Sequence, residues 1–136
     1  MNLKCKFFHE CFKSANVSIE YPEISLCKEH YIKYIQDKVK KTVRDFNLID
    51  FEDPNEKILI ALSGGKDSQV LLSILVPLFN KSVKMEALYI NVGVSADKFS
   101  QRSQNFVQAL CEQAKIPLNV LYIDDNLGLN MDNIHE

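Results

Sequence analysis

Residues 58–68 constrain the fold of this chain more than any other segment. They consist of the apolar run Ile-Leu-Ile-Ala-Leu followed directly by Ser-Gly-Gly-Lys-Asp-Ser. A short, continuous apolar run is typical of a buried parallel strand in an α/β protein. Two of the four glycines in the chain lie in the next six residues, where the chain has to turn from the strand into a helix. The segment therefore predicts an α/β fold with a parallel sheet.

Residues 63–68 have the composition of a phosphate-binding loop. Two adjacent glycines allow backbone N–H groups to turn toward an anion, because no Cβ atom hinders that conformation. Lys66 adds a positive charge, and a helix that begins near Asp67 would direct the positive end of its dipole to the same place. The loop is not a Walker A motif, which needs Gly where this chain has Ile60 and Ser or Thr where it has Asp67. A turn without a ligand is the alternative, but such a turn requires no Lys, Asp and paired serines.

Helices and strands alternate after this loop. The periodicity predicts a helix at residues 67–75, a strand at 85–92, a second helix at 97–115 and a third strand at 118–123. We expect Pro77 to end or kink the first helix, because proline has no N–H to donate. The result would be three parallel strands with flanking helices.

Single residues of these elements allow further expectations. Four apolar residues of the first helix are expected to face the sheet: Val70, Leu71, Ile74 and Leu75. Cys111 lies next to apolar positions of the second helix, so packing in the core explains it better than a role in sulfur transfer. Asp124 and Asp125 follow the third strand at the edge where α/β sheets bind ligands. A solvated strand end is the preferred explanation for these two carboxylates.

The first 30 residues contain a set of candidate metal ligands. Cys27 and His30 have C-x2-H spacing, and fifteen residues separate Cys11 from Cys27. This pattern is typical of zinc sites. The fourth ligand is Cys5 or His9, and Cys5 is preferred because a third thiolate gives a Cys3His set. Because the segment has few large apolar residues for a core of its own, zinc would supply the missing stability. The alternative is buried cysteines without a metal.

A basic amphipathic helix follows the cysteine-rich segment. Apolar residues recur at steps of three and four between residues 29 and 46, which predicts a helix with a charged outer face. The basic residues of that face are Lys33, Lys38, Lys40, Lys41 and Arg44. They could approach a polyanion such as RNA, although a solvated helix face explains them as well. Residues 47–55, with Asp-Pro near their end, are expected to form a linker.

The composition is that of a soluble globular protein. Apolar residues make up 46% and charged residues 25% of the 136 residues, and the formal net charge is −2. No apolar stretch approaches the roughly 20 residues of a membrane span. The first twelve residues mix Lys, Cys, His and Glu where a signal peptide would need an apolar run. We therefore expect a cytoplasmic location, and a length that fits one modest domain or a small module with part of a larger domain.

The hexapeptide Ser-Gly-Gly-Lys-Asp-Ser between a buried strand and a helix resembles the PP-loop of the N-type ATP pyrophosphatases. The resemblance extends to the Cys/His segment with its basic helix and to Leu-Tyr-Ile-Asn-Val-Gly at residues 88–93. These features are similar to the tRNA 2-thiolation subgroup, and within it to 2-thiouridine synthetases that have an N-terminal zinc module. The resemblance covers nearly the whole chain. It implies an adenine nucleotide alpha-hydrolase-like fold, ATP and Mg²⁺ as cofactors beside Zn²⁺, and tRNA as a partner.

The resemblance also implies the roles of individual residues. The pyrophosphate part of ATP would be held by Ser63, Gly64, Gly65, Asp67 and Ser68. Lys66 would neutralise it, with Lys66 and Asp67 as the catalytic pair, and Ala61 and Ile90 would line the base and ribose. In the family, ATP adenylates the C2 oxygen of a uridine with release of pyrophosphate, and a sulfur nucleophile then displaces AMP. The nucleophile would come from a sulfur-donor protein or from sulfide.

Comparison with the family indicates a chain that is the N-terminal part of a longer protein. The strand at residues 58–62 should be central in the family's sheet, but here it would lie at an edge. No Cys follows Cys111, so an iron–sulfur cluster would belong to a missing C-terminal part or to a partner chain. We expect a zinc module at residues 1–31, a helix and linker at 32–55, and an incomplete ATP-binding domain at 56–136. The resemblance leaves a homodimer open.

Two other functions are compatible with the sequence. The first is a non-catalytic module that binds zinc and a nucleotide or RNA, in a split or degenerate PP-loop protein. The second is an ATP pyrophosphatase that makes an amide or a nucleotide. The cysteine-rich segment and the basic helix argue against the second function, because a small-molecule amidotransferase has no evident use for a surface that faces a polyanion.

Overall fold

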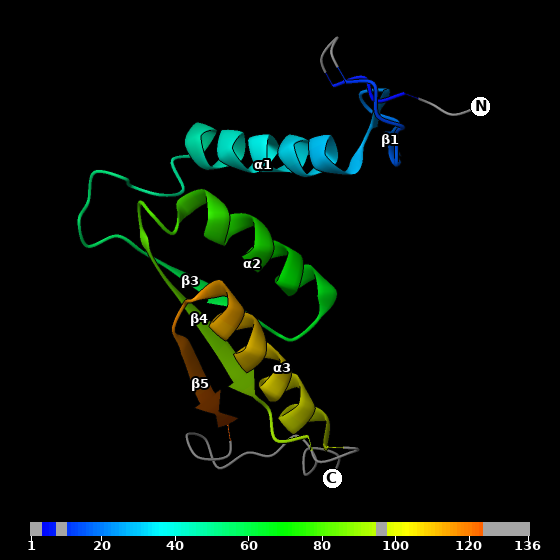
Figure 1. Ribbon diagram of the computed structural model, residues 1–136. Coiled ribbons are helices and arrows are strands. Elements are labelled where there is room, and N and C mark those ends of the chain that lie inside the picture. Colours follow the sequence, from blue (N-terminus) through cyan, green and yellow to red (C-terminus); the bar gives the residue numbers. More distant parts are fainter. Residues whose placement is uncertain (1–3, 8–10, 95–97, 124–136) are drawn as a thin grey trace. The chain divides into compact units, whose positions relative to one another are not determined.

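The computed structural model describes residues 4–7, 11–94 and 98–123 (Figure 1). The chain forms two compact units, Met1–Ile49 and Asp50–Glu136. Each unit has its own β-sheet. The division predicted from the sequence, into residues 1–31, 32–55 and 56–136, stays a prediction. His9, Asp97, Asp124 and Asp125 lie outside the described residues.

The first unit consists of a β-hairpin and one long helix. Strands β1 (Val17–Ile19) and β2 (Ile24–Leu26) pair antiparallel, and helix α1 (Lys28–Asp45) follows directly. The helix agrees with the predicted range 29–46 to within one residue at each end. The hairpin was not predicted, although Val-Ser-Ile and Ile-Ser-Leu alternate apolar and polar residues on either side of a turn.

A small core cluster holds the first unit together. Its buried residues are Cys5, Leu26 and Cys27. The apolar residues packed against them are Phe7, Cys11, Ile19, Ile24, Tyr31 and Tyr34. Two of the three buried residues are thus cysteines and not large hydrocarbon side chains. Such a core buries little apolar surface, so the cysteines have to contribute more than packing.

The second unit is a parallel α/β structure, as the sequence predicts. Its elements are β3 (Lys57–Ala61), α2 (Lys66–Phe79), β4 (Lys84–Asn91), α3 (Phe99–Ala114) and β5 (Leu118–Tyr122). The strands pair in the order β3-β4-β5, and both pairs are parallel. Strand β3 is therefore an edge strand of the described sheet, with β4 at the centre.

Only one face of this sheet is covered by the described residues. Along β4 the side chains of Met85, Ala87 and Tyr89 are buried, and those between them are more exposed. Helices α2 and α3 contact each other and lie over the buried face (Figure 1). On the other face Leu59 is 59% and Ile90 46% exposed. This one-sided burial distinguishes the unit from a sheet that is covered on both faces.

Helix α2 differs from the prediction in its length and in the face that it buries. It continues to Phe79, two residues beyond Pro77, because a proline near the C-terminal end of a helix removes only one backbone hydrogen bond. Leu72 and Phe79 are buried, whereas Val70 is 55% and Leu71 45% exposed. The prediction that Val70 and Leu71 face the sheet is therefore wrong. The helix is apolar on most sides, so periodicity alone did not select the packed face.

Helix α3 contributes Val107 and Cys111 to the core, both with at most 1% exposure. Burial raises the pKa of the Cys111 thiol, as expected for a cysteine that serves packing. None of the helices in the described part of the chain is both long and apolar enough to span a bilayer.

Candidate functional site

The predicted phosphate-binding loop lies at the carboxyl edge of the sheet. Strand β3 ends at Ala61, the Leu62 amide still donates to the Leu88 carbonyl at 2.8 Å, and α2 begins at Lys66. Gly64 has a φ of +82°, a conformation that L side chains rarely adopt. The glycine is thus required by the abrupt turn from strand to helix.

Hydrogen bonds within the loop and the first turn of α2 fix its shape. The Ser68 hydroxyl donates to the Gly65 carbonyl at 2.9 Å, and the Gln69 amide donates to the Gly64 carbonyl at 3.2 Å. The Gly65 N–H donates to the Ser63 hydroxyl at 3.3 Å. Both glycine carbonyl oxygens are therefore engaged by side chains of α2, which leaves the loop with few acceptors that would repel an anion.

The N-terminus of α2 remains available to a ligand. Its N-cap is Gly65, and none of the side chains that the structure describes caps the helix. The first amides of a helix have no intrahelical partner and attract anions. Lys66 and Asp67 follow at once, and both side chains are exposed. The structure therefore brings Ser63, Gly64, Gly65, Lys66, Asp67 and Ser68 together around one open helix end.

Ala61 and Ile90 lie on the uncovered face of the sheet beside this loop. Ala61 pairs with Leu88, so Ile90 is two residues further along the neighbouring strand and on the same face. Both side chains are exposed. The arrangement offers an apolar surface next to the loop, which is what a nucleotide base requires.

A hydrogen-bonded network that the sequence did not reveal crosses the carboxyl ends of β4 and β5. The Asn91 amide donates to Gln104 at 2.8 Å, and the Gln104 amide donates to the Tyr122 hydroxyl at 2.8 Å. Ser103 of the same helix lies against the loop, 3.4 Å from where a Cβ atom of Gly64 would be. The only signal in the sequence was a polar residue, Asn91, at the end of an apolar strand. Because the network joins three elements, spacing alone could not predict it.

Four side chains of the first unit form a candidate metal site. The ligand atoms of Cys5, Cys11, Cys27 and His30 all lie within 4.8 Å of one another. The Nδ1 atom of His30 is 3.2 Å from the Cys5 Sγ and 3.4 Å from the Cys27 Sγ. When four sulfur or nitrogen atoms bind a zinc ion tetrahedrally at about 2.3 Å, these atoms are about 4 Å or slightly less from one another. The quartet predicted from the sequence, with Cys5 as the fourth ligand, thus lies close enough together to hold one metal ion, and zinc as that ion stays a prediction.

The surroundings of the thiols differ in a way that suits metal binding. Burial raises the pKa of the Cys5 thiol. Hydrogen bonds from the Cys27 and Phe7 backbone and from His30 have the larger combined effect, and they lower this pKa to about 6. The Lys13 backbone lowers the pKa of Cys11, yet burial and the sulfurs of Cys5 and Cys27 together raise it. Thiolates packed so closely repel one another, and a bound cation removes that repulsion.

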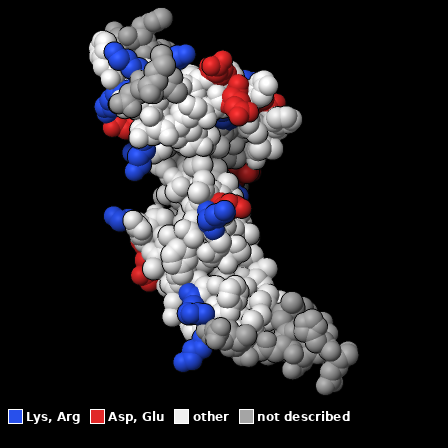
Figure 2. Space-filling model, turned by 90° about the vertical axis from the view of Figure 1, so that its right-hand side faces the viewer, with Lys and Arg blue, Asp and Glu red and all other residues white. Residues whose placement is uncertain are grey.

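The basic face of α1 is partly neutralised by its neighbours. Lys41 and Arg44 both form ion pairs with Asp45. The ammonium groups of Lys33 and Lys38 lie 5.7 and 5.4 Å from the ring centroids of Phe7 and Tyr34, within cation–π distance. Uncharged surface also predominates on the face of the molecule drawn in Figure 2. A polyanion would therefore meet local groups of positive charge.

A model of a known protein family matches most of the chain. The sequence model of the PP-loop domain matches residues 27–136. The chain belongs to the PP-loop domain family. This family assignment confirms the resemblance that was based on the hexapeptide at residues 63–68.

The relatives of this PP-loop chain include tRNA-thiolating proteins. A tRNA-5-methyluridine(54) 2-sulfurtransferase of Pyrococcus horikoshii is 34% identical over 132 residues, which are 97% of this chain and 39% of that protein. A cytoplasmic tRNA 2-thiolation protein 1 of Debaryomyces hansenii is 28% identical over 80% of this chain and 28% of its own length. The chain thus spans about two fifths or less of these relatives.

A solved structure shares the fold of this chain. The U34-tRNA thiolase NcsA of Methanococcus maripaludis, determined with its [4Fe-4S] cluster, superposes with a TM-score of 0.81 at 27% identity. The match covers 100% of this chain and 43% of NcsA. The parallel sheet with flanking helices predicted from the sequence is therefore confirmed.

Proposed function

We propose that this chain is the ATP-binding part of an enzyme that replaces the C2 oxygen of a tRNA uridine by sulfur. The open N-terminus of α2 behind the Ser63–Ser68 loop is the observation that carries this function. The thiolating relatives and the structural likeness to NcsA support the choice of tRNA and sulfur over other substrates of the same ATP chemistry. The Cys/His quartet supports it further, because the tRNA 2-thiolation proteins that the chain resembles have an N-terminal zinc module.

The loop would act on the departing pyrophosphate. When the uridine oxygen attacks the α-phosphate of ATP, the bond to the β-phosphate breaks and negative charge builds on the leaving group. The uncapped amides of α2 and the exposed Lys66 ammonium are already in position before that charge develops, so they can stabilise it without reorganisation. A sulfur nucleophile from a donor protein or sulfide then displaces AMP. Ala61 and Ile90 would hold the adenosine beside the loop.

Two metal ions belong to the proposal. Zn²⁺ would be held by Cys5, Cys11, Cys27 and His30 and would stabilise the first unit. Mg²⁺ would accompany the phosphates of ATP, and the exposed Asp67 carboxylate is the oxygen ligand that the loop itself offers. We also infer a cytoplasmic location, which the cytoplasmic relative and the four free cysteines support.

Calorimetric titration of the chain with ATP and with pyrophosphate tests this proposal. We expect Lys66→Ala to weaken binding of both ligands by about tenfold or more, because a charge-assisted contact is lost. Lys40→Ala, an exposed residue of α1, is the matched control and should bind as the parent chain does. Equal binding by all three proteins would refute the loop as the ATP site.

Product analysis separates the enzyme from the non-catalytic module. When the chain is extended to the full length of its relatives, a reaction with ATP, a tRNA transcript and sulfide should release pyrophosphate and AMP and form a 2-thiouridine. If ATP and tRNA bind but no pyrophosphate forms, the binding module is the correct function.

A further inference from the structure

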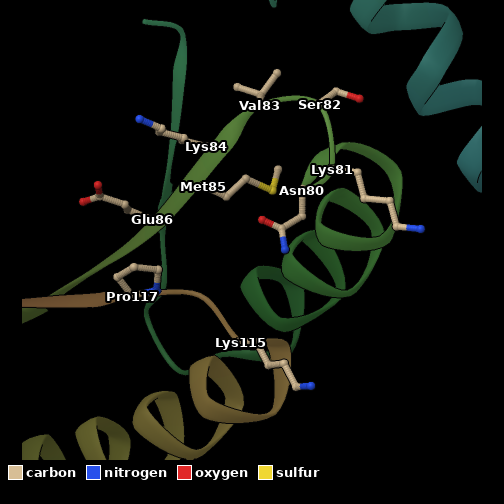
Figure 3. Close-up of a pocket in the computed structure, with 9 residues that line it drawn as sticks. All are labelled: Asn80, Lys81, Ser82, Val83, Lys84, Met85, Glu86, Lys115 and Pro117. Atoms are coloured by element: carbon tan, nitrogen blue, oxygen red, sulfur yellow. The ribbon is translucent and has the colours of Figure 1, made fainter. Parts of the chain in front are cut away.

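A pocket of about 410 Å³ lies at the edge of the sheet opposite to the loop (Figure 3). Strands β4 and β5 begin here and helices α2 and α3 end here, because all three strands run in the same direction. The pocket is lined by Asn80, Lys81, Ser82, Val83, Lys84, Met85, Glu86, Lys115 and Pro117. None of these residues belongs to the proposed ATP site or to the metal quartet.

Three lysines from different elements surround this pocket. Lys81 follows the end of α2, Lys84 is the first residue of β4, and Lys115 is the C-cap of α3. In Figure 3, Lys81 and Lys115 extend from one side of the pocket and Lys84 from the other. Lys57 pairs with Lys84 at the start of the β3–β4 ladder, so a fourth ammonium group belongs to the same edge. All four side chains are exposed.

The positive charge of these lysines is not neutralised within the described part of the chain. The ion pairs found there, Lys13–Glu29, Lys41–Asp45 and Arg44–Asp45, include none of the four. The carboxylate of Glu86, which also lines the pocket, accepts a hydrogen bond from the Asn119 amide. Glu112, one turn before Lys115, accepts one from Gln108. Within the described residues these four lysines form no ion pair with a carboxylate, so their ammonium groups remain open to an anionic ligand.

We propose that this pocket binds consecutive phosphate groups of an RNA backbone, an inference that rests on the proposed tRNA substrate. Ammonium groups spread along one edge of the sheet suit a line of charges better than one small anion. No aromatic side chain is among the described residues that line the pocket, so the contact is with phosphates and not with stacked bases. Residues 51–136 contain seven Lys and Arg against eleven Asp and Glu, and four of those seven lie at this edge. The second unit therefore has one local surface that attracts RNA.

The helix ends offer a structural alternative that the test has to separate. Lys81 and Lys115 lie next to the carbonyl ends of α2 and α3, where a positive charge stabilises the helix dipole. A role confined to the dipole would affect the melting temperature and leave RNA binding unchanged.

The test measures binding of a fluorescent tRNA transcript by the full chain between about 50 and 200 mM KCl, the range of salt concentration over which phosphate contacts lose most of their affinity. The first variant is Lys81→Gln/Lys84→Gln/Lys115→Asn, in which Asn tolerates the left-handed backbone at position 115. The matched control is Lys81→Arg/Lys84→Arg/Lys115→Arg, which keeps the charge. We expect the neutral variant to lose about tenfold in affinity and about two units of the log–log salt slope, and the arginine variant to bind as the parent chain does. An RNA of unrelated sequence should lose the same factor.

Several results would overturn the inference. One is unchanged RNA affinity of the neutral variant with a lower melting temperature. Another is a loss of binding to polyglutamate but not to RNA, which would make the ligand an acidic peptide. A third is a parent chain that does not bind tRNA at about 50 mM KCl, a salt concentration at which phosphate contacts are still strong. ATP titration keeps the two proposals apart: both triple variants of the pocket lysines should bind ATP normally, and a parent chain without ATP binding would refute the proposed function alone.

Discussion

At the scale of single residues, the two glycines of the loop have different physical requirements. Gly64 has a φ of +82°, whereas Gly65 has a φ of −77°, which any residue adopts. We predict that Gly64→Ala lowers the free energy of unfolding by about 1–2 kcal/mol. Gly65→Ala should change it by less than about 0.5 kcal/mol, because a stiffer unfolded chain offsets the poorer N-cap. Urea unfolding of both variants measures the difference, and equal losses would contradict the loop geometry.

The cysteine ligands make metal binding dependent on pH. The pKa of Cys5 is lowered to about 6, so its thiolate is the favoured form in the folded unit above pH 6 and is lost as the pH falls through that value. We predict that the chain retains zinc at pH 7 and releases it as the pH falls below about 6, because protons compete with the metal for the thiolate. A colorimetric chelator follows the release. Cys111→Ala, outside the quartet, should give the same profile, whereas full retention of zinc at pH 4 would be inconsistent with this ligand set.

At the scale of the elements, α2 provides a direct test of which helix face is packed. Leu72 is 4% exposed, and Val70, two residues earlier, is 55% exposed. Leu72→Ala should lower the free energy of unfolding by about 2–5 kcal/mol because it leaves a cavity. Val70→Ala should change it by no more than about 0.5 kcal/mol, as at other surface positions. Chemical unfolding of the two variants checks this, and a larger loss for Val70→Ala would restore the face predicted from the sequence.

Sequence reasoning succeeded where local patterns were specific and failed where tertiary contacts decide. The run at residues 58–62 and the following hexapeptide predicted β3, the loop and the start of α2, because each depends on neighbouring residues. The face of α2 was mispredicted since apolar residues occur around most of that helix. The hydrogen-bonded network of Asn91, Gln104 and Tyr122 joins β4, α3 and β5, so only the fold brings these three residues together. Strands β1 and β2 are three residues each, too short for periodicity to be recognised.

At the scale of the whole molecule, the two units should depend on zinc to different degrees. In the core cluster of Met1–Ile49, two of the three buried residues are the candidate ligands Cys5 and Cys27. The unit Asp50–Glu136 has a core of hydrocarbon side chains such as Ile60, Leu72 and Val107. We predict that a strong chelator exposes the amides of the first unit to hydrogen exchange and leaves those of β3, β4 and α3 protected, since metal-binding free energy is folding free energy only where the ligands form the core.

Hydrogen exchange followed by mass spectrometry measures each unit separately. Cys27→Ser without chelator should reproduce the effect, which excludes a direct action of the chelator on the protein. Cys111→Ala should instead affect only the second unit, because Cys111 packs within α3 and is 1% exposed. Protection of β1 and β2 that persists in chelator would show that the first unit folds without metal, and simultaneous loss in both units would show that they unfold together.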